Sequence, residues 1–219
     1  MKLKTHLFFI PLILFLSILI GLYFMFKKEG FTTTSSTSND KTILLLGDSM
    51  LANHSYVEKG HSIKDYIEEI FPKDRVFMLA KNNSTIQDVF HQLDKIPFDL
   101  DKSTTYIFLS AGGNDLLNAE PDLNSRTLNQ IFDKYTILVD SIITRLPNAK
   151  LYALTLYTPQ DQPDHPYISI WNQKLKKLLP FRNIIDTSLL INSKKDLVYN
   201  IEPSANGGKK IATAILQRI

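Results

Sequence analysis

The chain has no cysteine among its 219 residues. Disulfide bonds, cysteine-based metal sites and thiol nucleophiles are therefore excluded, while the redox compartment is left open. The sequence also lacks metal-ligand spacing and a glycine-rich phosphate loop of the Walker or dinucleotide type. We therefore expect no cofactor and no metal.

The chain also has almost no net charge when the N-terminal lysines are left out of the count. The formal charge is +3, but Lys2, Lys4, Lys27 and Lys28 flank the first apolar run, and no acidic residue lies before Glu29. Without these four, 21 basic residues stand against 22 acidic ones. The rest of the chain is nearly neutral and has no excess of positive charge for binding nucleic acid, so we expect no nucleic-acid partner.

One long stretch without charge is present at the N-terminus. Residues 7–26 are twenty uncharged residues rich in Leu, Ile and Phe, long enough as a helix to span a hydrocarbon core of roughly 30 Å. A cleaved signal peptide is the alternative, but the run is long for a signal and no small-x-small site follows it. We predict a single-pass membrane anchor over residues 1–28. Lysines on both sides leave its orientation open.

The anchor is followed by a change of composition. Residues 29–40 are poor in apolar side chains and rich in Ser and Thr, which is typical of a flexible linker. A folded domain is expected over residues 41–219.

Apolar runs and helical periodicities alternate through this domain. Strands are predicted at 42–46, 75–79, 105–110, 150–156 and 182–186, and helices at 62–71, 85–93, 127–146, 168–178 and 207–217. Alternation of this kind indicates right-handed βαβ units. The expected fold class is therefore α/β, with a central parallel sheet covered by helices on both faces.

Small and polar residues follow the ends of three predicted strands. The first group is Gly47-Asp48-Ser49, the second lies around Asn83, and the third is Gly112-Gly113-Asn114-Asp115. In open α/β sheets the carboxyl ends of the strands form the ligand crevice. Ser49 is a candidate nucleophile. Its own N–H, the N–H near Asn83 and the Asn114 amide are candidate oxyanion donors. Taken alone, each motif also fits a strand followed by a helix cap.

Taken together, these motifs resemble the SGNH (GDSL-type) hydrolase superfamily. The first block of that family matches Gly47-Asp48-Ser49, and its Gly-x-Asn-Asp block matches Gly112-Gly113-Asn114-Asp115. The resemblance implies a three-layer, flavodoxin-like fold over residues 41–219. It also implies Ser49 as nucleophile and oxyanion donor, and Asn114 as side-chain oxyanion donor. Gly47, Asp48, Gly112, Gly113 and Asp115 are then expected to contact the substrate.

Two blocks depart from the family pattern. Asn83 stands closest to the usual oxyanion glycine, and asparagine tolerates the left-handed backbone region that such a turn requires. The usual Asp-x-x-His-Pro is replaced by Tyr199-Asn200-Ile201-Glu202-Pro203, so Tyr199 occupies the Asp position and Glu202 the His position. The tail resembles a branch of the superfamily that carries the same glutamate.

Glu202 is therefore the candidate general base. A carboxylate is a weaker base than histidine, but burial raises its pKa toward neutrality. The alternatives are a site that only binds, with Glu202 capping the last helix or pairing with a lysine, and a histidine base. His54, His61, His91 and His165 are all interpreted as surface or loop residues, and Asp196 as a solvated loop charge.

The sequence thus predicts a membrane-anchored serine esterase acting on an ester or O-acyl group, with a small-molecule, lipid or glycan acyl ester as substrate. The alternative is a catalytically inactive module that binds an acyl group, a glycan or a protein partner. A folded ectodomain without either activity is the third hypothesis.

Overall fold

The computed structural model describes residues 40–162 and 165–219. The anchor predicted over 1–28 and nearly all of the linker predicted over 29–40 lie outside these residues. Within the described part of the chain, no helix is both long enough and apolar enough to cross a membrane.

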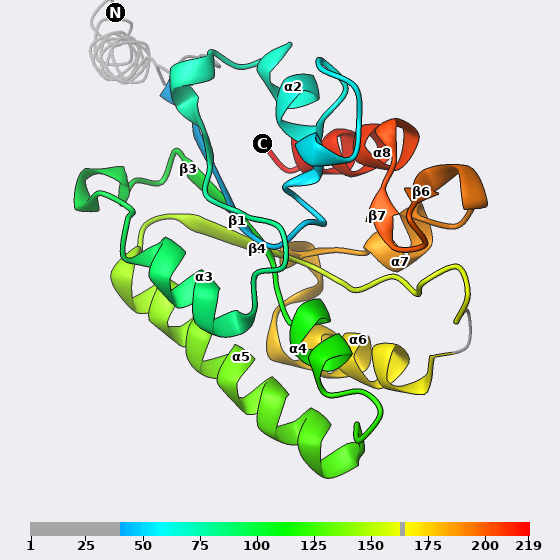
Figure 1. The fold of residues 1–219 in the computed structure, drawn as a ribbon. Helices are drawn as coiled ribbons and strands as arrows, with labels where there is room; N and C mark the ends of the chain where they lie inside the picture. Colours follow the sequence, from blue (N-terminus) through cyan, green and yellow to red (C-terminus); the bar gives the residue numbers. More distant parts are fainter. Residues whose placement is uncertain (1–39, 163–164) are drawn as a thin grey trace, which may run out of the picture. The chain divides into compact units, whose positions relative to one another are not determined.

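Five parallel strands form the central sheet (Figure 1), in the order β2-β1-β3-β4-β5. They are β1 (Thr42–Gly47), β2 (Val76–Met78), β3 (Thr105–Ser110), β4 (Lys150–Leu154) and β5 (Ile184–Ile185). This is the flavodoxin-like strand order. In the β1–β3 register Gly47 lies opposite Ser110, so the ends of these two strands meet at one edge of the sheet.

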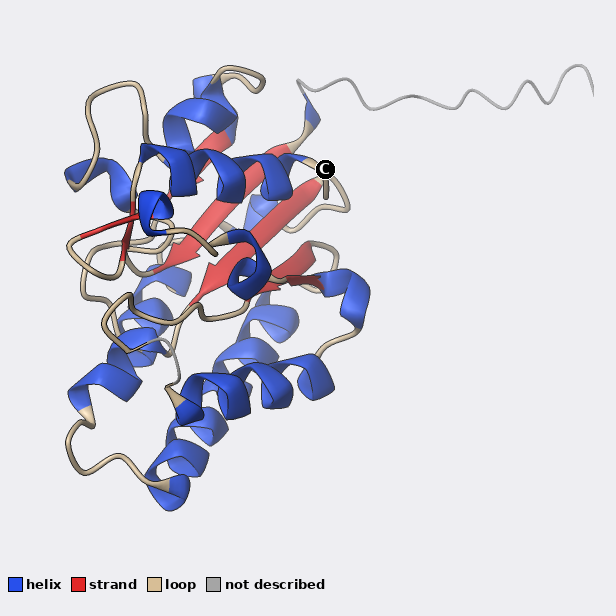
Figure 2. Ribbon diagram, turned by 90° about the vertical axis from the view of Figure 1, so that its right-hand side faces the viewer, coloured by secondary structure: helices blue, strands red, loops and turns tan. Residues whose placement is uncertain are grey.

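Helices cover both faces of the sheet, as Figure 2 shows. One layer contains α2 (Ile63–Glu68) and α8 (Ala205–Leu216), which contact each other. The other contains α3 (Ile86–Leu93), α5 (Ser125–Arg145) and α6 (Pro166–Leu178), with α5 packed against both of its neighbours. The predicted three-layer α/β architecture is therefore confirmed.

The central strands are buried along their whole length. Every residue of β1 and β3 is buried, as expected for parallel strands covered on both faces. This explains why β1 reads as a continuous apolar run that ends abruptly in Gly-Asp-Ser.

Side-chain caps set where several helices begin. Ser62 and Thr85 form capping boxes at the starts of α2 and α3. The Ser204 hydroxyl accepts a hydrogen bond from the Gly207 N–H, so α8 begins at Ala205 rather than at Gly207 as predicted. Each of these side chains satisfies a backbone donor that the first helical turn leaves free.

Short elements that the sequence pattern did not predict surround the carboxyl edge of the sheet. They are α4 (Gly113–Asn118), α7 (Thr187–Leu190) and an antiparallel pair of β6 (Leu197–Val198) and β7 (Glu202–Pro203). Because Val198 pairs with Glu202 in that small sheet, the backbone of Glu202 is fixed by a strand rather than by a free loop.

Candidate active site

Gly47 lets β1 approach the end of β3 closely. Its φ is +129°, and a Cβ there would lie 1.7 Å from the Ser110 carbonyl oxygen, so no other residue fits without backbone movement. The buried Gln92 amide fixes the backbone of the same residue, accepting from the Gly47 N–H at 2.7 Å and donating to its carbonyl at 2.8 Å. Gly47 therefore shapes the turn before Ser49. It is not among the residues that line the cavity, and its substrate contact stays a prediction.

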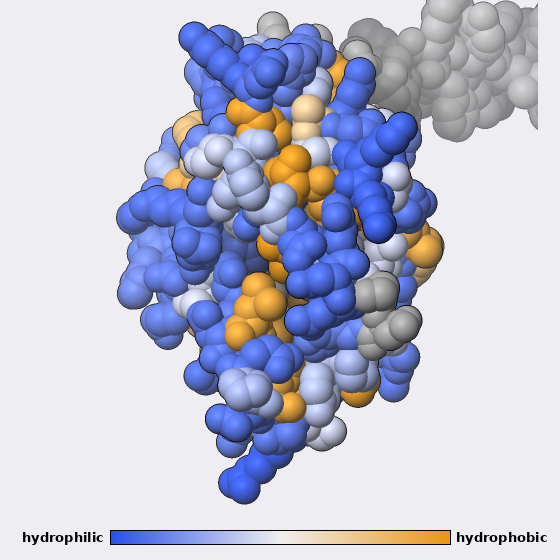
Figure 3. All heavy atoms as spheres, turned by 45° about the vertical axis from the view of Figure 1, so that its right-hand side comes forward, coloured by the Kyte–Doolittle hydropathy of each residue, from blue (hydrophilic) through white to orange (hydrophobic). Residues whose placement is uncertain are grey.

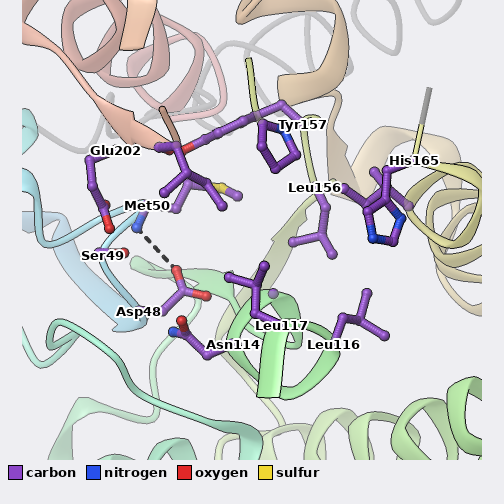
Figure 4. Close-up of a pocket in the computed structure, with 14 residues that line it drawn as sticks. Asp48, Ser49, Met50, Asn114, Leu116, Leu117, Leu156, Tyr157, His165 and Glu202 are labelled. Atoms are coloured by element: carbon purple, nitrogen blue, oxygen red, sulfur yellow. Dashed lines mark hydrogen bonds between the residues drawn. The ribbon is translucent and has the colours of Figure 1, made fainter. Parts of the chain in front are cut away.

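A cavity of about 60 Å³ opens beside Ser49. Figure 4 shows its lining, and Figure 3 shows apolar side chains gathered in a hollow on this side of the molecule. The lining consists of Asp48, Ser49, Met50, Gly113, Asn114, Leu116, Leu117, Leu156, Tyr157, Pro159, His165, Ile168, Ile201 and Glu202. Of the nine predicted site residues, five are in this lining, and its remaining members are mostly apolar.

The Glu202 carboxylate points toward Ser49, as seen in Figure 4. Burial raises the pKa of Glu202, and hydrogen bonds from the Ser49 and Tyr56 hydroxyls partly offset this by lowering it. A half-buried carboxylate that faces a serine hydroxyl is a candidate acceptor for the serine proton.

Two hydrogen bonds fix the segment that carries Glu202. The Asn53 side-chain amide donates to the Pro203 carbonyl at 3.3 Å, and the Tyr157 hydroxyl donates to the Ile201 carbonyl at 2.7 Å. Asn53 also accepts from the Ile63 N–H at 2.8 Å. The peptides on both sides of Glu202 are thereby tied to the cavity wall and to the loop that follows Ser49.

Asp48 is a second carboxylate in the cavity wall. Its Oδ1 accepts from the Ser110 hydroxyl at 2.8 Å and from the Met50 N–H at 3.1 Å. Burial raises its pKa to about 6, the hydrogen bonds from Ser110 and Met50 act in the opposite direction, and the charge of Glu202 adds to the increase. The Met50 contact closes the turn around Ser49, so Asp48 holds the backbone of this candidate nucleophile.

The Asn114 side chain reaches the cavity from the first turn of α4. Its Nδ2 donates to the Ser84 carbonyl at 2.9 Å. A primary amide carries two donor hydrogens, so one of them is left for an oxygen in the cavity. Gly113, the residue before it, also lines the cavity.

Gly112 and Asp115 make contacts within the fold, and their substrate contacts stay predictions. Gly112 has φ +99°, and a Cβ there would lie 2.2 Å from the Trp171 ring. The Asp115 carboxylate accepts from the Ile86 N–H at 2.9 Å, which ties α4 to the start of α3. Neither residue lines the cavity.

Comparisons with known proteins find similar solved structures but no match by sequence. No family model matches the sequence. No curated protein matches it significantly. Solved structures match over most of their own length.

One similar structure is a member of the lipolytic protein G-D-S-L family from Veillonella parvula, with a TM-score of 0.65, 14% identity, and coverage of 81% of this chain and 97% of that chain. Another is an acetyl xylan esterase, with a TM-score of 0.63, 13% identity, and coverage of 81% and 99%. A third is the esterase EstA from Pseudoalteromonas sp., with a TM-score of 0.60, 18% identity, and coverage of 81% and 96%.

The chain has the SGNH-hydrolase fold. The resemblance drawn from the sequence motifs is thus confirmed for the architecture, with Ser49 at the end of β1 and Asn114 after β3. At these identities the likeness establishes the fold, and chemistry has to be argued from the residues.

Asn83, which aligns most nearly with the usual oxyanion glycine, has a left-handed backbone conformation. Asn83 has φ +59°, so the predicted left-handed turn is confirmed. The residue is exposed and lies outside the cavity lining. Its N–H as an oxyanion donor stays a prediction.

The histidines divide into two groups. His54, His61 and His91 are exposed, as expected. His165 lies in a loop before α6, as predicted, but its side chain is only 8% exposed, lies 3.1 Å from the Glu120 carboxylate and lines the cavity. Figure 4 shows His165 on the side of the cavity opposite Ser49, so the group facing the serine is Glu202.

Asp196 is a buried structural residue, and its interpretation as a solvated charge was wrong. Its side chain is inaccessible and pairs with Lys210 at 2.7 Å. It also accepts from the Ser193 N–H at 3.0 Å, and its carbonyl accepts from the Ser204 N–H at 2.9 Å. Asp196 therefore anchors the segment leading to β7 against the start of α8.

Sequence reasoning missed Gln92, Asn53, Tyr56 and Tyr157, all of which position the site. Of these residues, Gln92 could have been found from the sequence, because a glutamine on the apolar face of an amphipathic helix is buried and needs hydrogen-bond partners. The other three lie in loops, where no periodicity marks a side chain as buried.

Proposed function

We propose that this chain is an SGNH-type serine esterase that cleaves an ester or O-acyl group through an acyl-enzyme on Ser49, with Glu202 as general base. The observation that carries the proposal is that the Glu202 carboxylate faces Ser49 across the cavity that both residues line. The fold, shared with structures described as esterases, supports it.

The proposed reaction has two steps. The Ser49 oxygen attacks the ester carbonyl while its proton passes to Glu202, and the resulting oxyanion is held by the Ser49 N–H and the Asn114 amide, with the Asn83 N–H as third donor. The carbonyl–oxygen bond to the alcohol then breaks, and Glu202 returns the proton to the leaving oxygen. Water, deprotonated by Glu202, attacks the acyl-enzyme and releases a carboxylic acid and the free serine.

Cavity size favours a short acyl group. A water molecule needs roughly 10–15 Å³ by the same measure, so a cavity of about 60 Å³ has room for only a few atoms beyond the carbonyl. We expect acetyl esters of p-nitrophenol to be cleaved faster than octanoyl esters.

Membrane attachment is part of the same proposal. Its support is the uncharged run over residues 7–26 with lysines on both sides. Extraction of membranes at alkaline pH tests it, since an integral anchor keeps the chain in the membrane fraction and a peripheral protein is released.

Covalent labelling of the full-length protein with a fluorophosphonate probe tests the catalytic proposal. We expect labelling that is lost in Ser49→Ala, falls in Glu202→Gln and rises with pH through the titration of Glu202. Labelling that is independent of Glu202 contradicts the assignment of the base. Folded wild-type protein that is not labelled contradicts the esterase.

The second candidate is a module that binds an acyl or glycan group without turnover. It is favoured by the position of Asn83, the expected third oxyanion donor, which is exposed and is not among the residues that line the cavity. Saturable binding of a short-chain ester without product formation and without labelling of Ser49 supports this candidate.

A further inference from the structure

The His165 side chain lines the cavity on the side opposite Ser49 (Figure 4). It lies directly before α6, which begins at Pro166, and is only 8% exposed. Its ring packs edge-on against that of Tyr167, with the ring centroids 6.1 Å apart and the ring planes inclined by 65°. Its Nε2 atom lies 3.1 Å from a carboxylate oxygen of Glu120. Both neighbours hold the ring in the cavity wall.

The other ring nitrogen of His165 has no partner. Six buried polar side-chain atoms lack a hydrogen-bond partner in the part of the chain that the structure describes, and His165 Nδ1 is the one that belongs to a residue of the cavity wall. A polar atom that is buried without a partner destabilises the protein. This position therefore favours a ligand that supplies the missing hydrogen bond.

Apolar side chains lie between His165 and the candidate nucleophile. Leu117 of α4 and Leu156 after β4 both line the cavity, and Figure 4 shows them between His165 and Ser49. With a volume of about 60 Å³, the cavity has room for only a few atoms beyond an ester carbonyl at Ser49. A group that fills it is therefore short, apolar in the middle and polar at the end that reaches His165.

We propose that His165 is a specificity-determining residue that recognises a hydroxyl group of the ester substrate through its Nδ1 atom. This inference rests on the proposed function and deepens it, because it names the substrate class. The substrates are short esters that carry a free hydroxyl a few atoms from the ester carbonyl. The hydroxyl belongs either to the acyl group or to the alcohol, and its hydrogen bond to His165 is the same in both cases.

The contact with Glu120 decides which groups suit the Nδ1 atom. An ionised carboxylate accepts hydrogen bonds and donates none, so Nε2 carries a hydrogen in this pair. Nδ1 is then an acceptor when the ring is neutral and a donor when the ring is charged. A hydroxyl group both accepts and donates, so it satisfies Nδ1 in either state. An alkyl chain satisfies it in neither.

The test uses pairs of esters in which a hydroxyl replaces a methyl group. Ethyl 3-hydroxypropanoate is paired with ethyl butyrate, and 2-hydroxyethyl acetate with propyl acetate, and acid release by the full-length protein is measured in a pH-stat. We expect the wild type to prefer the hydroxyl ester of at least one pair. His165→Leu should reduce that preference about tenfold, the size expected for one hydrogen bond. Comparing the two proteins on the same pair cancels any difference in reactivity between the esters.

Two further variants serve as controls. The amide of His165→Asn both accepts and donates and keeps a polar group close to the position of Nδ1, so it should restore most of the preference. His91 is an exposed histidine on α3, and His91→Leu should match the wild type. An alkyl fluorophosphonate has no hydroxyl to recognise, so the rate at which it labels Ser49 should be the same in the wild type and all three variants.

The outcomes separate this inference from the proposed function. A preference that depends on His165 supports the inference, and the pair that shows it tells whether the hydroxyl belongs to the acyl group or to the alcohol. Ester cleavage with the same preferences in the wild type and His165→Leu overturns the role of His165 alone. An equal loss of cleavage for both members of a pair, together with slower labelling, also overturns it, because a merely structural histidine gives that result. A wild type that cleaves no ester and is not labelled at Ser49 overturns the proposed function and this inference together.

Discussion

The Asn53 side-chain amide donates a hydrogen bond to the Pro203 carbonyl although 150 positions separate the two residues. This contact joins the loop that follows the nucleophile to the strand that carries the candidate base. The relative position of Ser49 and Glu202 therefore depends on a buried asparagine that touches neither of them in the hydrogen-bond network.

Replacing Asn53 should affect both stability and the site. Asn53→Ala leaves the Ile63 N–H and the Pro203 carbonyl without their partner, and we expect a loss of about 2–3 kcal/mol in unfolding free energy. We also expect slower labelling of Ser49, because the strand that carries Glu202 is no longer held in place relative to Ser49. Denaturant unfolding and labelling rates measure the two effects. Ile67→Val, a small cavity on α2 with a cost of about 1 kcal/mol, controls for stability and should leave the labelling rate unchanged.

Two glycines with positive φ should respond differently to the same substitution. Gly112→Ala drives a methyl group into the Trp171 ring, whereas Gly60→Ala meets no atom within 4 Å. We expect Gly60→Ala to cost about 1 kcal/mol of backbone strain and Gly112→Ala at least about 3 kcal/mol. Thermal unfolding of both variants checks this, and equal costs would show that the Trp171 contact is unimportant.

Asp48 should make stability fall as the pH rises. Its folded pKa of about 6 is above the unfolded value of 3.8, so its contribution is complete below the unfolded value and is lost as the pH rises through about 6. The full effect is about 3 kcal/mol. Asp48→Asn keeps an oxygen acceptor for Ser110 and Met50 and removes the titration.

We therefore expect Asp48→Asn to unfold at a higher temperature than the wild type at pH 8, with a much smaller difference at pH 4. Melting curves at the two pH values measure this. A gap of the same size at both pH values would mean that Asp48 does not titrate in this range.

The Asp196–Lys210 pair has the opposite dependence on pH. Burial acts to raise the pKa of Asp196, but hydrogen bonds from Lys210 and two backbone N–H groups outweigh it and lower the pKa. The resulting stability is present above the unfolded pKa and is lost as the pH falls through the folded value.

Lys210→Met should cost about 3 kcal/mol near pH 7, since it leaves a buried carboxylate without its cation, and the difference from wild type should shrink in acid. Lys209→Met is the control. Lys209 is exposed and its ammonium group lies over the Tyr66 ring, 5.8 Å from the ring centroid, so its loss should change stability by less than about 1 kcal/mol. Denaturant midpoints across pH measure the pair, and similar losses in both variants would contradict the role of Lys210.

The sequence predicted the sheet better than the site. β1 and β3 were identified almost to the residue, because a buried parallel strand is a continuous apolar run. A strand was also predicted at 182–186, and β5 within that range is only two residues long. α4, α7, β6 and β7 are also too short for periodicity to indicate them.

Within the site, Ser49, Asn114 and Glu202 meet at one cavity, as the motifs imply. The motifs did not indicate the residues that hold the surrounding backbone in place. Asp196 was misread because a charged residue in a loop usually faces solvent, and only tertiary contacts decide otherwise. The same reason hid Asn53 and the cavity position of His165.

The two ends of the folded domain meet far from the cavity. The Lys41 ammonium group donates to the carbonyl of Ile219 at 2.8 Å, at the edge of the sheet where β1 begins, while Ser49 follows the other end of that strand. Six strand residues separate the two edges, roughly 20 Å. A fluorescent fusion at the C-terminus should therefore leave substrate access unobstructed. A circular permutant that joins residue 219 to residue 41 through a short linker, with new termini in a surface loop, should keep the site intact.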